Sequence, residues 1–138
     1  NKLTSGPFVS AKKVASQAEK WIDLLRIKTT GRKELVMQLS GGNQQKVVFS
    51  RALASPAKII ILNHPTRGVD VGAKEEIYSL IRDIVADGKS VILLGDTLDE
   101  CIGMSSRILV LQDGLITGEF DASVDHKPSQ VDVVSLMM

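Results

Sequence analysis

The sequence lacks the features of several large classes of protein. Cys101 is the only cysteine among 138 residues, so an internal disulfide is excluded and a reducing compartment is expected. No apolar run approaches the roughly 20 residues that span a bilayer, and no stretch reads as a signal peptide. These absences argue against a disulfide-stapled secreted domain and against a membrane span within this sequence.

The sequence also lacks an excess of charge of either sign, because the net charge is only +1. No basic field therefore indicates a nucleic-acid partner. His64, His126 and Cys101 have no spacing typical of a metal site. Hydrophobic residues make up 43% and charged residues 24%, which is the composition of an ordinary globular protein.

Apolar periodicity predicts an alternation of helices and strands after an irregular start at residues 1–9. Helices are expected at residues 10–25, 43–54, 73–86, 98–103 and 128–137. Strands are expected at residues 57–62, 90–94, 107–112 and 115–119, the last two joined by a turn at Asp113 and Gly114. The first two strands are short apolar runs, which predicts strands buried on both faces of a sheet.

Strands that alternate with helices predict an α/β fold with a mostly parallel sheet. Ligands of such sheets bind at the carboxyl ends of the strands, which points to the loops after Leu62 and Leu94. We expect one partial domain made of residues 1–54, residues 55–122 and a carboxy-terminal extension at residues 123–138. Asn1 stands where an initiator methionine would be expected, so we interpret the sequence as a piece of something longer.

Ser40, Gly41 and Gly42 stand at the start of a predicted helix. A serine can cap free amides there, glycines let an anion approach the backbone, and the helix dipole favours negative charge. The same three residues could equally be a plain helix cap.

Four segments in order resemble the ATP-binding domain of ABC transporters, most closely the second ATPase half of bacterial monosaccharide importers. Residues 39–46 read LSGGNQQK and resemble the signature motif, and residues 59–66 read IIILNHPT and resemble the Walker B strand. Residues 67–74, RGVDVGAK, resemble the D-loop region, and residues 103–114, GMSSRILVLQDG, also resemble that family. The resemblance implies a partial P-loop-NTPase (RecA-like) sheet, preceded by part of the helical subdomain.

The resemblance also implies two ATPase halves that face each other head to tail, with ATP and Mg²⁺ between them. Ser40, Gly41 and Gly42 would then contact the γ-phosphate of a nucleotide held by the partner half, with Asn43 nearby. Asp70 would lie at the D-loop across the same interface, although it also suits a helix cap before Ala73.

Several hydrolytic positions of the family are altered or missing. No Walker A motif is present, since Gly88-Lys89-Ser90 precedes a strand and reads as a helix end plus a turn. Asn63 stands where Walker B has the Mg²⁺-binding aspartate, and it lacks the charge that hard Mg²⁺ prefers. His64 stands at the catalytic glutamate position, where it could still accept a proton.

Asp96 stands at the position of the family's switch histidine. A carboxylate there would repel a γ-phosphate by about 1 kcal/mol when well solvated at contact distance. Asp96 could instead face solvent and cap the helix that begins near Leu98. Asn63, His64 and Asp96 together predict a degenerate nucleotide site in a half that still completes the site of its partner.

We therefore expect part of a peripheral ATP-binding subunit that energises sugar import at the cytoplasmic side of a bacterial inner membrane. Its partners would be a second ATP-binding half, in the same polypeptide or as a homodimer, permease subunits and, indirectly, a substrate-binding protein. A nucleoside importer, a non-catalytic regulatory module and, more remotely, a nucleic-acid-acting ATPase remain as alternatives. The isolated chain is expected to lack ATPase activity, to hold no nucleotide tightly and to self-associate through exposed strand edges.

Overall fold

The computed structural model describes residues 4–5 and 8–138, which form two compact units. The first unit comprises Asn1–Ile60 and Gly68–Ser90, and the second comprises Ile61–Arg67 and Val91–Met138. Among the described residues, no helix combines the length and the apolar character needed to cross a bilayer.

The first unit begins with two short paired strands, β1 (Thr4–Ser5) and β2 (Phe8–Val9). The prediction of an irregular start was therefore wrong for these four residues, whereas Gly6 and Pro7 lie outside the described residues. Two residues per strand are too few to show an apolar alternation in the sequence.

Helix α1 (Ala11–Leu24) begins after Ser10, whose side chain accepts a hydrogen bond from the Lys13 amide. Its apolar stripe ends at the buried Leu25, while Trp21 on the same helix is half-buried. A short 3-10 helix, η1 (Val36–Gln38), then leads to α2 (Gly41–Ala54). Helix α2 begins at Gly41, two residues before the predicted start.

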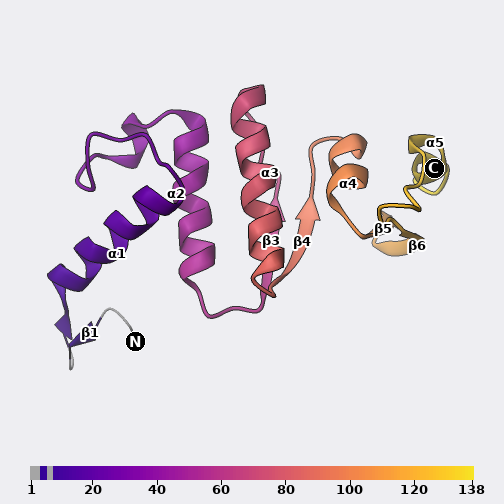
Figure 1. Ribbon diagram of the computed structural model, residues 1–138. Coiled ribbons are helices and arrows are strands. Elements are labelled where there is room, and N and C mark those ends of the chain that lie inside the picture. Colours follow the sequence, from indigo (N-terminus) through magenta and orange to yellow (C-terminus); the bar gives the residue numbers. More distant parts are fainter. Residues whose placement is uncertain (1–3, 6–7) are drawn as a thin grey trace. The chain divides into compact units, whose positions relative to one another are not determined.

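Helices α2 and α3 (Val71–Ala86) pack side by side in the first unit (Figure 1). The buried side chains of the two helices include Phe49, Ile77, Ile81 and Ile84, which follow the predicted helical spacing. Gly88 ends α3 with a positive φ of 83°, as expected of a carboxy-terminal cap. The packing of α2 against α3 thus supports the helix that begins at the signature residues.

Strands β3 (Ile59–Asn63) and β4 (Ser90–Leu94) form a parallel pair. The Ser90 amide bonds the Lys58 carbonyl at one end, and the His64 amide bonds the Leu94 carbonyl at the other. Both strands were expected to be buried on both faces, but Ile61 is 67% and Ile92 is 52% exposed. The prediction was wrong because only one face of these strands is covered by other described residues.

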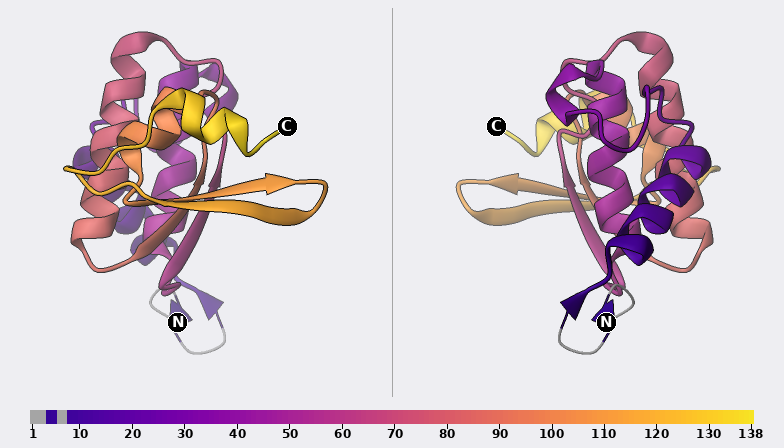
Figure 2. Two further views of the ribbon diagram at one scale, coloured as in Figure 1. Left: turned by 90° about the vertical axis from the view of Figure 1, so that its right-hand side faces the viewer. Right: turned by 90° about the vertical axis from the view of Figure 1, so that its left-hand side faces the viewer.

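The second unit continues with α4 (Leu98–Met104), β5 (Arg107–Gln112), β6 (Leu115–Asp121) and α5 (Gln130–Ser135). Figure 2 shows β5 and β6 as an antiparallel hairpin, closed by Asp113 and Gly114 at φ 50° and 81°. The hydrophobic core of the second unit contains Ile108, Val110, Ala122 and Val133. Ser129, not Pro128, begins α5, because its hydroxyl and the Asp132 carboxylate form a capping box.

The α/β class predicted from the sequence is confirmed, and the carboxyl ends of β3 and β4 lead into the loops singled out as candidate sites.

Candidate functional site

The signature residues lie at the amino-terminal end of α2, in the first unit. Ser40 is the N-cap residue, but its side chain accepts no hydrogen bond from the helix amides. The Ser40 hydroxyl instead accepts a hydrogen bond of 2.8 Å from the Asn43 side-chain amide. The expectation that the serine caps its own helix was therefore wrong, and the first helix amides are left without a side-chain cap, as an anion-binding helix end requires.

Asn43 connects this helix start to the loop after α1. Its Oδ1 atom accepts a hydrogen bond of 2.9 Å from the Lys28 amide, while its Nδ2 atom donates to Ser40. Both ends of the Asn43 side chain are thus engaged within its own chain. This geometry suits a residue that orients Ser40.

The loop that follows Lys28 is fastened by Glu34. The Glu34 carboxylate accepts hydrogen bonds from the Thr29 hydroxyl, the Thr30 amide and the Thr30 hydroxyl. These bonds, that of Thr29 first, lower the pKa of Glu34 below its ordinary value. At neutral pH the ionised carboxylate therefore keeps this loop closed.

The two signature glycines differ in their surroundings. A Cβ atom on Gly41 would meet the Gly68 carbonyl oxygen at 3.5 Å, which is an ordinary contact. A Cβ atom on Gly42 would lie 2.8 Å from the Cβ of Ala73, so the two helices would have to shift apart to accommodate it. Gly42 thus allows α2 and the start of α3 to approach closely, a structural role beside any contact with phosphate.

Asp70 is the N-cap residue of α3, and its Oδ1 atom accepts a hydrogen bond of 2.9 Å from the Ala73 amide. Asp70 therefore caps α3 in this structure, as one of its two interpretations predicted. Asp70 and the signature residues belong to the same unit, and the Asp70 side chain is exposed.

Asn63 and His64 lie at the carboxyl end of β3, in the second unit. Asn63 is the last residue of the strand and is exposed. His64 has a left-handed backbone with φ 49°, and its carbonyl accepts a hydrogen bond from the Arg67 amide across a tight turn. A non-glycine residue in this conformation is uncommon, and it turns the chain sharply away from the sheet.

His64 and Asp96 contact each other across the ends of β3 and β4. The Nδ1 atom of His64 lies 2.8 Å from the Oδ1 atom of Asp96, although the alignment does not make it a hydrogen bond. The side chains are 42% and 22% exposed. The structure therefore brings together two residues that were treated as separate changes on the basis of the sequence.

The suggestion that Asp96 caps α4 was wrong. Thr97 is the N-cap residue, and its hydroxyl accepts a hydrogen bond from the Glu100 amide. Thr97 lies closer to the helix start, so the Asp96 side chain is free to approach His64.

The sequence analysis missed Glu100 and Thr66. Both side chains are buried, and the Thr66 hydroxyl donates a hydrogen bond to the Glu100 carboxylate. A glutamate in the first turn of a helix is usually explained by its favourable interaction with the helix dipole, so Glu100 was not singled out. The available signal was a charged residue directly before the apolar Cys101 and Ile102.

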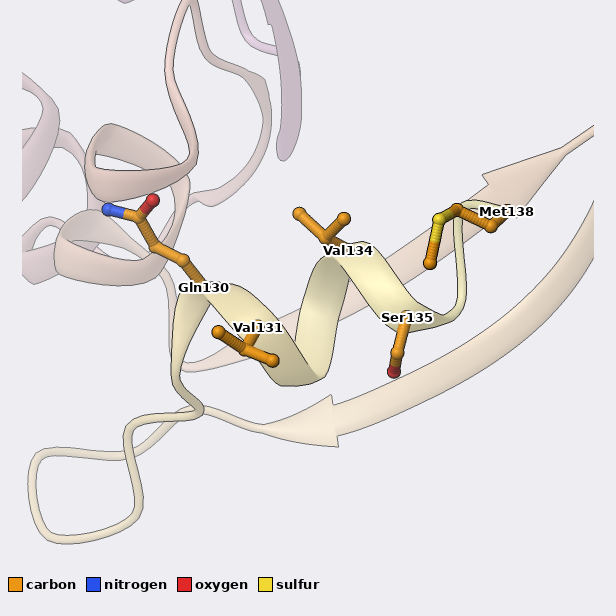
Figure 3. Close-up of a pocket in the computed structure, with 5 residues that line it drawn as sticks. All are labelled: Gln130, Val131, Val134, Ser135 and Met138. Atoms are coloured by element: carbon orange, nitrogen blue, oxygen red, sulfur yellow. The ribbon is translucent and has the colours of Figure 1, made fainter.

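One shallow apolar hollow lies along α5 and does not involve these residues. Figure 3 shows the side chains that line it, Gln130, Val131, Val134, Ser135 and Met138. None of the residues predicted to contact nucleotide is among them. Among the described residues, no group of three histidine, cysteine or acidic side chains could hold a metal ion.

Comparison with known proteins agrees with the motifs. A family model described as ABC transporter matches residues 2–67. The arabinose import ATP-binding protein AraG of Paraburkholderia xenovorans is 47% identical over 118 residues, and the xylose import ATP-binding protein XylG of Moorella thermoacetica is 52% identical over 103 residues. The chain matches part of an ABC transporter ATP-binding domain. The matches cover 85% and 75% of the chain but only 23% and 20% of these relatives.

Solved ABC cassettes have the same fold. The dimeric cassette MJ0796 is 28% identical with a TM-score of 0.70, and the match covers 86% of this chain and 51% of that one. The cassette MJ1267 has a TM-score of 0.73 at 22% identity, over 96% of this chain and 53% of that one, and supports the fold alone. The chain therefore corresponds to about half of one ABC cassette.

Proposed function

We propose that this ABC chain belongs to an ATP-binding subunit that energises sugar import from the cytoplasmic side of a bacterial inner membrane. The main support is its identity of about half to AraG and XylG, whose names describe them as import proteins for arabinose and xylose. In this proposal the subunit is peripheral and works with permease subunits and, through them, a substrate-binding protein. A nucleoside is the second candidate cargo.

The signature residues would act on a nucleotide bound by a second ATP-binding half. The exposed Ser40 and Gly41 and the uncapped start of α2 support this role, because amides at a helix start bind phosphate oxygens. Asn43 would orient the serine, and Asp70 would lie at the same interface while capping α3. The pairing of two copies in the dimeric structure of MJ0796 is consistent with this arrangement.

The decisive experiment is uptake by the full-length subunit assembled with its permease. Ser40→Arg places a bulky cation at the exposed helix start and should reduce ATP-driven uptake at least about tenfold, equivalent to ~1.4 kcal/mol. Ser16→Arg, on the exposed face of α1, adds the same charge elsewhere and should leave uptake unchanged. Labelled arabinose, xylose and a nucleoside would identify the cargo class. Equal uptake by both variants would contradict a role of the signature residues at a nucleotide bound by the second ATP-binding half.

The nucleotide site on this chain's own half would be degenerate. Asn63 lacks the charge that holds Mg²⁺, and His64 and Asp96 contact each other where the family has glutamate and histidine. Asn63→Asp with His64→Glu should therefore raise ATP turnover of the full-length protein. The idea fails if turnover does not rise and the unmodified protein already hydrolyses two ATP per transport cycle.

A second candidate is that His64 acts as a general base supported by Asp96. The distance of 2.8 Å favours it, since a carboxylate beside an imidazole can orient the ring. His64→Gln and Asp96→Asn distinguish the two candidates. Turnover should fall sharply in both variants if the pair is catalytic, and it should stay unchanged if the site is degenerate.

A further inference from the structure

A buried carboxylate in the second unit contacts both loops that carry the altered hydrolytic residues. Glu100 is the third residue of α4, and only 6% of its surface is exposed. A buried glutamate is costly unless its oxygens accept hydrogen bonds from well-placed donors. Its partners therefore indicate what the burial accomplishes.

The two carboxylate oxygens of Glu100 bond different loops. One oxygen accepts a hydrogen bond from the Thr66 hydroxyl, in the turn after β3. The other accepts a hydrogen bond of 2.7 Å from the Asp96 amide, in the loop after β4. Thr66 is fully buried, so its hydroxyl bonds this carboxylate in place of water. Glu100 thus joins the turn that begins at His64 to the residue that faces His64.

The bond pattern differs from an ordinary capping box. In that motif the glutamate at the third helix position bonds the amide of the N-cap residue itself. Here the N-cap residue is Thr97, and the Glu100 side chain passes it to reach the Asp96 amide. Capping alone does not require this longer reach, nor does it require a bond to Thr66.

Gly95 makes room for this arrangement. A Cβ atom at Gly95 would lie 2.8 Å from the Cys101 sulfur and 3.1 Å from a Glu100 carboxylate oxygen. The lack of a side chain at this position lets the loop lie directly against the carboxylate. Gly95, Glu100 and Thr66 are therefore mutually dependent.

We propose that Glu100 is a positioning residue of this edge of the nucleotide site. Its carboxylate holds the loops after β3 and β4 at a fixed separation, so that the side chains at positions 64 and 96 face each other. The proposal extends the proposed function to a residue outside the family motifs, and it does not depend on whether the site hydrolyses ATP.

The test measures the contact between His64 and Asp96 by NMR of the full-length protein with ¹³C-labelled histidine rings. The His64 resonance is assigned by its loss in His64→Gln. Asp96→Asn removes the facing carboxylate and shifts this resonance. The same substitution is then made in Glu100→Leu, which removes both acceptor oxygens, and in Thr66→Val, which loses the hydroxyl but keeps the shape.

In both backgrounds the shift caused by Asp96→Asn should fall by at least about half, as expected of coupled residues. Thr66→Ser keeps the hydroxyl and should retain the full shift. A shift of unchanged size in Glu100→Leu or Thr66→Val would overturn the proposal, because the contact of His64 with Asp96 would then persist without the bonds of Glu100. If Glu100→Leu does not fold, Thr66→Val against Thr66→Ser decides.

This outcome is independent of the uptake experiment. Unchanged uptake in Ser40→Arg would contradict the role of the signature in trans, whereas the NMR comparison would still show whether Glu100 positions the two loops.

Discussion

His64 and Asp96 meet at the ends of β3 and β4, where the resemblance to ABC cassettes implies a glutamate and a histidine. Under the proposed function each change alone would disturb a nucleotide site, because a carboxylate repels a γ-phosphate and a histidine differs in reach from a glutamate. The Nδ1 atom of His64 and the Oδ1 atom of Asp96 lie 2.8 Å apart. The effects of substitutions at these two positions should therefore not be additive.

Gly42 offers a test of whether the signature glycines are structural. Gly42→Ala should destabilise the protein by about 1–3 kcal/mol, because the new Cβ atom would overlap the Cβ of Ala73. Adding Ala73→Gly removes the overlapping atom, so the double variant should be destabilised less than the sum of the two single variants. Urea unfolding gives the three free energies.

Gly103→Ala is the matched control, since a Cβ atom added there would meet no heavy atom within 4 Å and the residue belongs to α4. It should be neutral or stabilising by up to about 1 kcal/mol. Additive effects of Gly42→Ala and Ala73→Gly would show that the close approach of α2 and α3 is not what requires the glycine.

Helix α2 is fixed to its neighbours by a buried lysine. Lys46 forms an ion pair of 2.6 Å with Glu76 of α3, and its ammonium also donates to the Arg26 carbonyl after α1. The Lys46 side chain is buried, whereas Glu76 remains well exposed. The ion pair is therefore partly screened by solvent, and much of the contribution of Lys46 should come from the packing of its aliphatic stem.

Substitutions at Lys46 should separate packing from charge. Lys46→Met keeps the length of the side chain and removes the charge, whereas Lys46→Ala also leaves a void. Lys46→Ala should therefore be less stable than Lys46→Met by about 2 kcal/mol, measured by chemical unfolding. If Lys46→Met loses as much stability as Lys46→Ala, the charge of Lys46, and not its stem, accounts for its contribution.

Helix α5 carries a pH-dependent cap. The Ser129 hydroxyl, and next the Ser129 amide, lower the pKa of Asp132 by bonding its ionised form. The resulting stability is present above the ordinary pKa of the carboxyl and is lost as the pH falls through the lowered value in the folded state.

Ser129→Ala should therefore raise the pKa of Asp132 toward its ordinary value, as measured by NMR titration of the carboxyl group. The difference in stability between the two proteins should shrink at acid pH, where Asp132 is protonated in both. Ser129→Thr keeps the hydroxyl and should resemble the original. An unchanged pKa in Ser129→Ala would contradict the capping box.

Elements with strong local signals were predictable from the sequence. Asp113 and Gly114 gave the hairpin because two consecutive positive φ angles demand such residues. Gly88 and the apolar spacing of α3 gave that helix and its end. The exposure of β3 and β4 was not predictable, because an apolar run shows that a strand can be buried and not how many layers cover it.

The site was predictable only in part. Motif order indicated Ser40 and His64, since these residues stand at fixed places within contiguous segments. The contact of His64 with Asp96 and the bonds of Glu100 to Thr66 join residues more than thirty positions apart. Such contacts depend on the pairing of β3 with β4, which no local pattern specifies.

At the scale of the whole molecule, the chain exposes apolar strand surface. Ile61 and Ile92, on neighbouring strands, are both more than half exposed. Apolar side chains beside unpaired strand edges favour pairing with another copy. The isolated chain should therefore associate in a concentration-dependent manner, measured by sedimentation velocity.

Ile61→Thr with Ile92→Thr should reduce this association while keeping β-branched side chains in the strands. Val124→Thr is the control, because Val124 is 89% exposed but lies outside every strand. A monomer at all concentrations, or an equal effect of Val124→Thr, would contradict association through β3 and β4.

The bond between Asn43 and the Lys28 amide has a consequence for how this family's sequences vary. The contact uses only the backbone of residue 28, so exchanging the lysine for almost any other residue should keep this bond. Proline is the exception, because it has no amide hydrogen to donate. A position fifteen residues before Asn43, with no recognisable pattern of its own, would thus tolerate nearly every side chain and forbid one.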